Sequence, residues 1–259
     1  LVSAPAHDVA LLLKSYAPDF SYAQRLVESF NKYNIEHLKM YVLVPPNDVQ
    51  LFDTLAGDYV QVLDESLLAH HLVDKKTGGM RPGYINQEII KLAFWELVDS
   101  DALFIRPIHT SDFLATDGSP YTVLVEDLEL KVEPRYYEQY WSERERSLRV
   151  IQSQIGLEAP VILTCHGHQI FSTAVLKDFV HSFLTPRGWD YRDALAIAPY
   201  EFSWYNFWLQ KSHAIPIHPR EPLVKVFHNE NQHFEHIFKG VGLSDLARGY
   251  LAVVVNSNF

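Results

Sequence analysis

HLKMYVLVPP, residues 37–46, decides how the first part of this chain folds. It is a nearly continuous apolar run closed by two prolines, a pattern typical of a strand that is buried on both faces of a sheet. VALLLKS (9–15) and YVQVL (59–63) have the same character, and residues 47–55 indicate a short helix between the second and third runs. These segments predict three strands.

The segment between the first two runs predicts a longer helix. Ser21 and Gln24 have the spacing of a capping box. The helix that they would open turns Leu26, Val27 and Phe30 inward. Strands separated by helices of this length indicate right-handed βαβ crossovers, and hence an α/β fold with a mostly parallel, Rossmann-type central sheet flanked by helices. Ligands of such sheets bind at the carboxyl ends of the strands.

An amphipathic helix is predicted for YINQEIIKLAFWEL, residues 84–97. Its apolar stripe is formed by Ile85, Ile89, Leu92 and Ala93. A second stripe carries Tyr84, Gln87 and Lys91, and the last two stand one turn apart. The loop before this helix, residues 74–84, concentrates glycine, proline and cationic residues. We expect it at the surface, where loops often carry function.

The second half of the chain is less regular. We expect helices at about 135–155, after residue 172 as far as Leu184, and near 231–238, and strands at 161–165, 223–228 and 250–257. PYEFSWYNFWL (199–209) is strongly aromatic. Because the sequence has no internal repeat and no evident interdomain linker, we expect a single domain over residues 1–259.

Composition narrows the class of protein. Of the 259 residues, 47% are apolar and 21% are charged, which is ordinary for a globular chain. A formal net charge of −10 argues against broad nucleic-acid binding, and no apolar stretch is long enough to be a transmembrane segment. Cys165 is the only cysteine, which fits a reducing compartment and predicts a cytoplasmic protein. Phosphate-loop, dinucleotide-binding and nucleophile-elbow motifs are absent.

DSDALFIRP (99–107) contains a pair of aspartates. On a strand end, Asp99 and Asp101 would project to the same side and repel each other unless a cation lies between them. Mg²⁺ and Mn²⁺ prefer oxygen ligands and commonly bridge carboxylates to phosphates. The alternative is a turn capped by Asp99 or Ser100, and the motif alone leaves both interpretations open.

A pair of histidines, His166 and His168, lies in an HGH motif. Histidines at i and i+2 on a strand end can hold zinc together with a third ligand. The chain has 13 histidines, so the motif also arises by chance. We favour an acceptor-side or structural role for this pair.

Several motifs, taken in order, resemble those of bacterial glycosyltransferases of the DUF6492 type. They are KSY (14–16), GYINQEIIKL (83–92), DSDALFIRP (99–107), the aspartate–glycine turn at 117–118, YEFSWYNFW (200–208) and FHNENQ (227–232). The resemblance covers the chain from about residue 8 to its end. It implies a GT-A-like, nucleotide-sugar-dependent enzyme of surface polysaccharide assembly, lipopolysaccharide or capsule. The donor-binding part would span about 8–130 and the acceptor-side part about 131–259.

The resemblance implies a metal site and a donor site. Asp99 and Asp101 would ligate Mn²⁺ or Mg²⁺, with His228 as the third ligand and Asp101 counted as catalytic. The nucleotide sugar would contact Lys14, Ser15, Tyr16, Arg81, Gln87, Lys91 and Asp99. Each role has a plain alternative: Lys14 as the end of a strand, Gln87 and Lys91 as helix surface, and His228 as a structural histidine.

The resemblance also implies an acceptor side. Glu201 would be the catalytic acceptor base or an acceptor-binding carboxylate. His166, His168, Tyr200 and Trp204 would lie nearby, with aromatic rings suited to stacking on sugars. The alternative for the aromatic run is a place in the core.

The function implied is metal-dependent transfer of a sugar, hexosyltransferase-like, from a nucleotide-diphosphate sugar to a bacterial surface glycan, with retention or inversion left open. The partners would be the donor and the acceptor glycan, with room for peripheral association with a membrane glycan assembly complex. Two alternatives remain open: a metal-dependent hydrolase that uses the histidines and aspartates, and a non-catalytic carbohydrate-binding domain.

Overall fold

A computed structural model describes residues 9–96, 103–104, 106–124, 134–159, 168–227 and 230–255. Contacts within this part of the chain divide it into two compact units. Unit 1 is built from the described parts of 1–67, 98–116 and 222–259, and unit 2 from those of 68–97 and 117–221.

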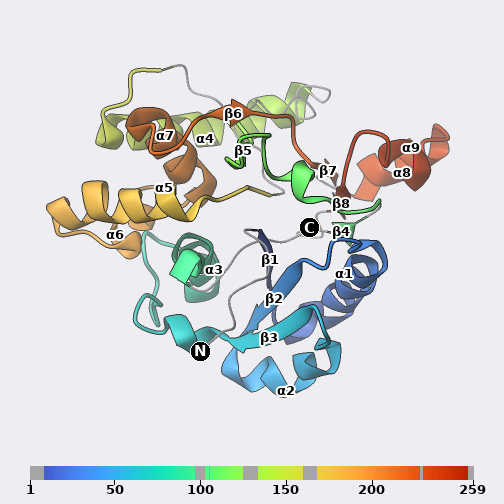
Figure 1. The fold of residues 1–259 in the computed structure, drawn as a ribbon. Coiled ribbons are helices and arrows are strands. Elements are labelled where there is room, and N and C mark those ends of the chain that lie inside the picture. Colours follow the sequence, from blue (N-terminus) through green and yellow to red (C-terminus); the bar gives the residue numbers. More distant parts are fainter. Residues whose placement is uncertain are drawn as a thin grey trace. The chain divides into compact units, whose positions relative to one another are not determined.

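Unit 1 contains the three strands that the apolar runs predicted (Figure 1). They are β1 (Ala10–Lys14), β2 (Lys39–Val44) and β3 (Val60–Asp64), all parallel and in the order β1-β2-β3. The helices α1 (Phe20–Tyr33) and α2 (Val49–Phe52) provide the crossovers. Met40 to Val44 of the central strand are buried, as a strand covered on both faces requires.

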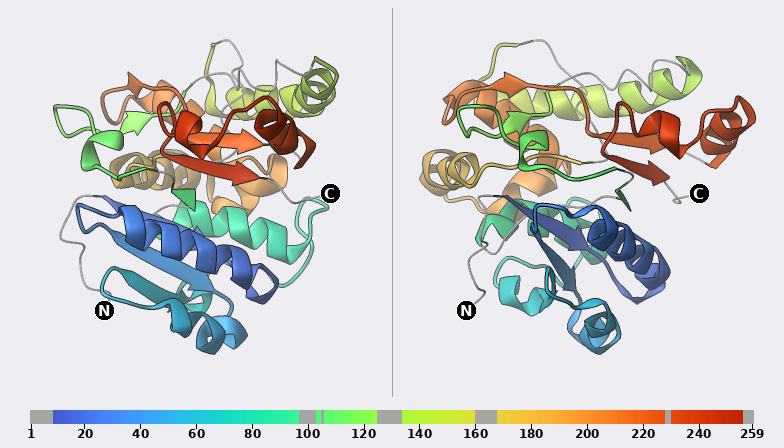
Figure 2. Two further views of the ribbon diagram at one scale, coloured as in Figure 1. Left: turned by 90° about the vertical axis from the view of Figure 1, so that its right-hand side faces the viewer. Right: turned by 45° about the vertical axis from the view of Figure 1, so that its right-hand side comes forward.

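A second sheet of unit 1 joins late strands to a short earlier one. Its members are β4 (Leu103–Phe104), β7 (Val224–Phe227) and β8 (Ala252–Val255), in the order β4-β8-β7. β7 and β8 run parallel, and their arrows point the same way in Figure 2, whereas β4 is antiparallel to β8. α8 (Glu230–Phe238) and α9 (Leu243–Leu246) lie between β7 and β8 in the chain.

Unit 2 is mostly helical. Its helices are α3 (Pro82–Ala93), α4 (Pro134–Ile155), α5 (Thr173–Asp178) with a π-helical continuation (Phe179–Leu184), α6 (Tyr191–Ile197) and α7 (Glu201–Ser212). A short parallel pair, β5 (Tyr121–Thr122) and β6 (His218–Pro219), accompanies them. The core is aromatic: the rings of Phe179 and Phe183 stack 5.3 Å apart, and Trp204 lies 5.9 Å from Phe183.

The loop before α3 contains a tight turn. Thr77 and Met80 exchange two backbone hydrogen bonds of 3.2 and 3.0 Å, with Gly78 and Gly79 at the turn. Both glycines have positive φ, +58° and +84°, which side-chain-bearing residues rarely adopt. A Cβ on Gly78 would lie 2.9 Å from the carbonyl oxygen of Ala196. Part of this loop is therefore fixed against α6.

The class of fold is confirmed as mixed α/β with small parallel sheets. A single central sheet is not confirmed, because the described strands lie in separate sheets of two or three strands. The predicted capping box is wrong: the chain enters α1 through a 3-10 turn at Ala17–Asp19, so that Ser21 lies inside the helix. The predicted strand at 161–165 lies outside the described residues. The division into a donor part and an acceptor part near residue 130 stays a prediction.

None of the helices in these described stretches is long and apolar enough to cross a bilayer.

Two glycines near α3 give a matched test of the turn. Gly78→Ala places a Cβ against the backbone of Ala196 and forces a left-handed alanine, so we expect it to lower the free energy of unfolding by about 1–3 kcal/mol. Gly83→Ala, inside α3, adds a methyl group at a point with no other atom within 4 Å, and we expect it to leave that free energy unchanged or to raise it by up to about 1 kcal/mol. Urea unfolding measures both. Equal effects of the two substitutions would contradict the turn geometry.

Candidate functional site

Two helices of unit 2 bring three ionisable side chains together. Nζ of Lys91, on α3, lies 2.9 Å from Oε1 of Glu201, the first residue of α7. The same nitrogen lies 3.2 Å from Oε2 of Glu88, one turn earlier on α3. Glu88 and Glu201 are only 4% and 6% exposed. The fold thus holds one ammonium group against two buried carboxyl groups, which we call the Lys91 cluster.

The pKa values of the two carboxyl groups in this cluster are shifted in opposite directions. Burial raises the pKa of Glu88 well above its usual value, and the charge of Glu201 raises it further. Burial acts on Glu201 in the same direction, but the attraction of Lys91 and hydrogen bonds, one of them from Glu88, outweigh it and lower the pKa of Glu201. Burial also opposes the charge on Lys91, but the two carboxyl groups outweigh it and raise its pKa. Because the pKa of Glu88 is raised and that of Glu201 is lowered, Glu88 takes up a proton before Glu201 as the pH falls, while Lys91 keeps its charge.

Aromatic and cationic side chains surround the cluster. The ring centroid of Phe202 lies 5.1 Å from Nζ of Lys91, and Cζ of Arg144 lies 4.6 Å from the ring centroid of Tyr200. Burial raises the pKa of Tyr84 to about 12, and the two glutamates act in the same direction. The Lys91 side chain remains 21% exposed. The lysine is thus the most exposed member of the cluster.

In unit 1, the end of β1 carries the three residues expected there. Nζ of Lys14 lies 2.9 Å from Oε2 of Glu65, and it also donates to the carbonyl oxygen of Ser15. Ser15 is buried, and its N–H donates to the carbonyl oxygen of Leu43. Tyr16 is 48% exposed. The position of these residues agrees with the sequence analysis, and their contact with a nucleoside stays a prediction.

The remaining predicted residues of unit 2 differ in exposure. Arg81 is exposed at the N-cap of α3, and Gln87 is half-buried on that helix. Tyr200, the N-cap of α7, is half-buried. Trp204 is fully buried, and its Nε1–H donates to the carbonyl oxygen of Ala198 at 2.8 Å. Trp204 therefore takes the core role that the sequence left open.

His168 is buried. Burial lowers its pKa to about 3, and the positive charge of Arg220 acts in the same direction. The imidazole is therefore neutral at physiological pH. The predicted metal ligands Asp99, Asp101 and His228 lie outside the described residues, as does His166.

Two groups of side chains were missed by sequence reasoning. Glu88 and Glu65 pair with predicted lysines, and Glu88 could have been found from its i, i+3 spacing to Lys91. The second group consists of His70, His71 and Glu96, whose ligand atoms lie within 4.8 Å of one another. The adjacent histidines at 70–71 were the only sequence signal for it, because Glu96 follows 25 residues later.

Comparison with known protein families places the chain in a family without an assigned activity. A family described as "Family of unknown function (DUF6492)" matches residues 9–240. The chain belongs to this family. Its description names no activity, so glycosyl transfer does not follow from membership. No curated protein matches the chain.

Glutamine substitutions test the shared charge of the Lys91 cluster. Glu88→Gln leaves the carboxylate of Glu201 facing Lys91. Glu201→Gln removes the charge that raises the pKa of Glu88, so that Glu88 ionises in its place. We expect each to cost less than about 2 kcal/mol of unfolding free energy, and the double variant to cost about 3–5 kcal/mol, since it leaves a buried ammonium without a counter-charge. Urea unfolding at pH 7 measures all three.

The control for this double-mutant cycle is Glu235→Gln. Glu235 forms an exposed ion pair with Lys239 at 3.5 Å, and its loss is expected to cost at most about 1 kcal/mol. A double variant whose loss equals the sum of two small single losses would show that the two carboxyl groups do not share Lys91.

Proposed function

We propose that this chain is a metal-dependent, hexosyltransferase-like glycosyltransferase that moves a sugar from a nucleotide-diphosphate sugar to a bacterial surface glycan. The observation that carries the proposal is the contact of Lys91 with Glu201. The resemblance assigned these residues separately, one to the donor and one to the acceptor, and they form an ion pair 110 positions apart in sequence. A cationic side chain that is partly exposed, beside a buried carboxylate, suits a reaction in which a phosphate leaves and a hydroxyl attacks.

In this proposal Glu201 binds the acceptor hydroxyl. Its lowered pKa keeps it ionised, so it accepts a hydrogen bond from the hydroxyl. Such a carboxylate is a weak base towards a free alcohol, and it receives the proton only as the new bond to the anomeric carbon makes the hydroxyl acidic. Glu88 donates a hydrogen bond to Glu201, and Lys91 supplies positive charge for the phosphate oxygens of the donor.

The parallel strands of unit 1 support the nucleotide-binding part of the proposal. The carboxyl ends of such strands are the usual place for ligands in α/β sheets. Lys14, Ser15 and Tyr16 lie at one of these ends, and we assign them to the nucleoside. We assign Arg81 and Gln87 to the donor, and Tyr200 to the acceptor. A GT-A-like arrangement, a cytoplasmic location and peripheral association with membrane glycan assembly belong to the same proposal.

The proposed metal ligands are Asp99, Asp101 and His228. Two carboxylates and one imidazole form an oxygen-rich donor set, which fits Mn²⁺ or Mg²⁺ and leaves positions for phosphate oxygens. When bound, such an ion offsets the negative charge of the departing nucleoside diphosphate.

The proposal predicts that metal and nucleotide bind together. Asp101→Asn keeps the side-chain shape and removes one charge. We therefore expect it to weaken the binding of a nucleoside diphosphate at least tenfold in the presence of Mn²⁺ and to leave binding without Mn²⁺ nearly unchanged. Isothermal titration of a panel of nucleoside diphosphates into both proteins, each with and without Mn²⁺, measures this difference.

Asp74→Asn is the matched control, because it removes one charge from an exposed aspartate in unit 2. Its two affinities, with and without Mn²⁺, should equal those of the wild type. If Asp101→Asn weakens binding equally with and without Mn²⁺, the aspartate pair is not a metal site. Binding of glycan that ignores both nucleotide and metal would favour the carbohydrate-binding alternative. Hydrolysis that needs a metal and no sugar acceptor would favour the hydrolase.

A further inference from the structure

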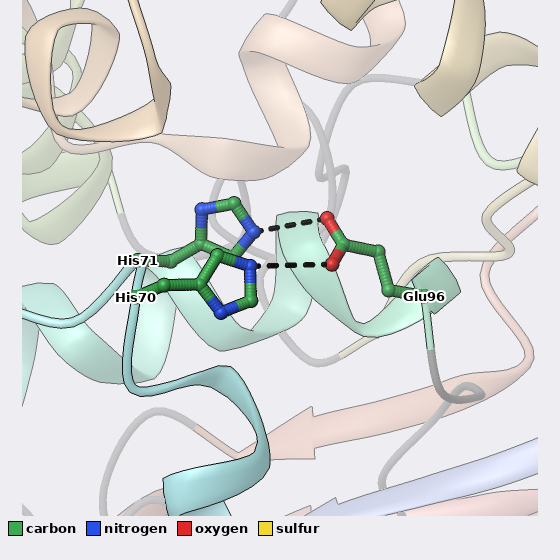
Figure 3. Close-up of side chains that lie close together, drawn as sticks. All are labelled: His70, His71 and Glu96. Carbon is green, nitrogen blue, oxygen red and sulfur yellow. Dashed lines mark hydrogen bonds and ion pairs between the residues drawn. The ribbon is translucent and has the colours of Figure 1, made fainter.

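Three side chains of unit 2 converge outside the Lys91 cluster. His70 and His71 lie in the segment before α3, and Glu96 lies in the 3-10 turn that follows this helix, Phe94–Glu96. Figure 3 shows both imidazoles directed at the carboxylate of Glu96. Nε2 of His71 lies 2.9 Å from Oε1 of Glu96, and Nε2 of His70 lies 3.6 Å from Oε2.

We propose that His70, His71 and Glu96 bind a divalent transition-metal ion, with Zn²⁺ as the best fit. Two imidazole nitrogens and one carboxylate oxygen form a donor set found in catalytic zinc sites. Ligands about 2.1 Å from a tetrahedral ion stand about 3.4 Å apart. The two imidazoles approach different oxygens of Glu96, at 2.9 and 3.6 Å. One ligand atom from each of the three residues lies within 4.8 Å of the other two, so an ion is accommodated when these side chains move together by at most about 1.4 Å.

The loop that carries the histidines is fixed in place. The side chain of Asn86, on α3, accepts a hydrogen bond from the N–H of Val73 at 2.8 Å and donates one to its carbonyl oxygen at 3.0 Å. The N–H of His71 donates to the carbonyl oxygen of Leu68 at 2.9 Å. Because Val73 follows His71 by two residues, this segment reaches α3 with little freedom, and binding costs little ordering entropy.

Aromatic packing holds the other side of the site. The ring of His71 packs edge-on against that of Tyr191, with centroids 5.2 Å apart. The hydroxyl of Tyr191 in turn accepts a hydrogen bond from Nε1–H of Trp95 at 2.7 Å. Trp95 precedes Glu96 in the chain. Its hydrogen bond to Tyr191 therefore fixes the 3-10 turn that carries Glu96, and it also fixes the ring of Tyr191 that packs against His71.

The exposure of the ligands indicates an open site. The side chains of His70, Glu96 and His71 are 62%, 29% and 18% exposed. Three protein ligands leave a fourth position of a tetrahedral ion for water or for an oxygen atom of a bound molecule, which is typical of catalytic rather than closed structural zinc sites. The site at His70, His71 and Glu96 has two nitrogen donors and one oxygen donor, whereas the set proposed at Asp99 and Asp101 is rich in oxygen. The inference of a zinc site therefore does not rest on the proposed function.

Zinc titration of the untagged, chelator-treated protein tests the inference. We expect the wild type to bind one equivalent of Zn²⁺ through this site, and His71→Gln and Glu96→Gln each to weaken binding at least tenfold. Zn²⁺ should also raise the melting temperature of the wild type, because ligand binding stabilises the folded state. It should not raise the melting temperature of either variant. Circular dichroism without metal shows whether the variants are folded, and Glu96→Asp, which keeps the charge, provides a milder second substitution of the carboxylate.

Two controls separate this site from other zinc binding. His181→Gln removes an exposed histidine elsewhere in unit 2 and should leave the zinc affinity unchanged. Asp101→Asn should also leave it unchanged, whereas the Mn²⁺-dependent binding of nucleotide should respond to Asp101→Asn and not to His71→Gln. Absence of zinc binding by the wild type, or zinc binding that His71→Gln and Glu96→Gln do not weaken, would overturn the inference whatever the outcome for the nucleotide.

Discussion

The ammonium group of Lys91, held against the carboxyl groups of Glu88 and Glu201, is the interaction on which the arrangement of unit 2 depends. Removing an ammonium and a carboxylate from water costs several kcal/mol for each ion, and only close contact offsets that cost. α3 and α7 are therefore constrained to keep Lys91 within hydrogen-bonding distance of Glu201, 2.9 Å in this structure. A buried pair of this kind need not add net stability, and apolar packing such as that of Trp204 against Phe183 favours the folded state of unit 2.

The same constraint separates the pKa values of the two carboxyl groups, Glu88 and Glu201. Two buried carboxyl groups beside one ammonium retain a proton, because a second unpaired negative charge in this environment is too costly. The raised pKa of Glu88 and the lowered pKa of Glu201 make Glu88 the carboxyl group that holds the proton more strongly. Titratable groups whose pKa values are driven apart in this way are typical of functional sites. Lys91 is the most exposed of the three side chains, at 21%, and in the function that we propose it faces the donor phosphates.

Local patterns predicted much of the fold. The apolar runs at 9–15, 37–46 and 59–63 form parallel strands. Apolar segments that alternate with helices are buried most readily as parallel strands with helices packed on the faces of the sheet. The stripe on α3 was equally clear, and Lys91 was identified from the opposite stripe. Glu88 was missed because a glutamate on a helix is usually solvated, and its burial depends on a partner 113 residues away that no local period encodes. The ion pair of Lys91 with Glu201 likewise depends on tertiary structure, because the two residues lie 110 positions apart in the sequence.

The histidines show the same limit. Attention to HGH at 166–168 followed a spacing rule, and His168 proved buried and neutral. His70 and His71 share no such rule, because adjacent residues converge on a third group only where a loop bends as this one does beside Asn86. Residue type predicted the kinds of chemistry available to the chain, and the loop geometry selected which histidines meet a carboxylate.

Carbon-13 NMR of carboxyl-labelled glutamate, followed from pH 3 to pH 8, measures the central claim directly. The resonance that disappears in Glu88→Gln should remain protonated well above pH 4.5, while the one that disappears in Glu201→Gln should stay ionised to below that pH. Glu235→Gln identifies an exposed glutamate as an internal reference. Two resonances that both titrate at the ordinary value for glutamate would contradict the account, because the two carboxyl groups would then neither be buried together nor share a proton.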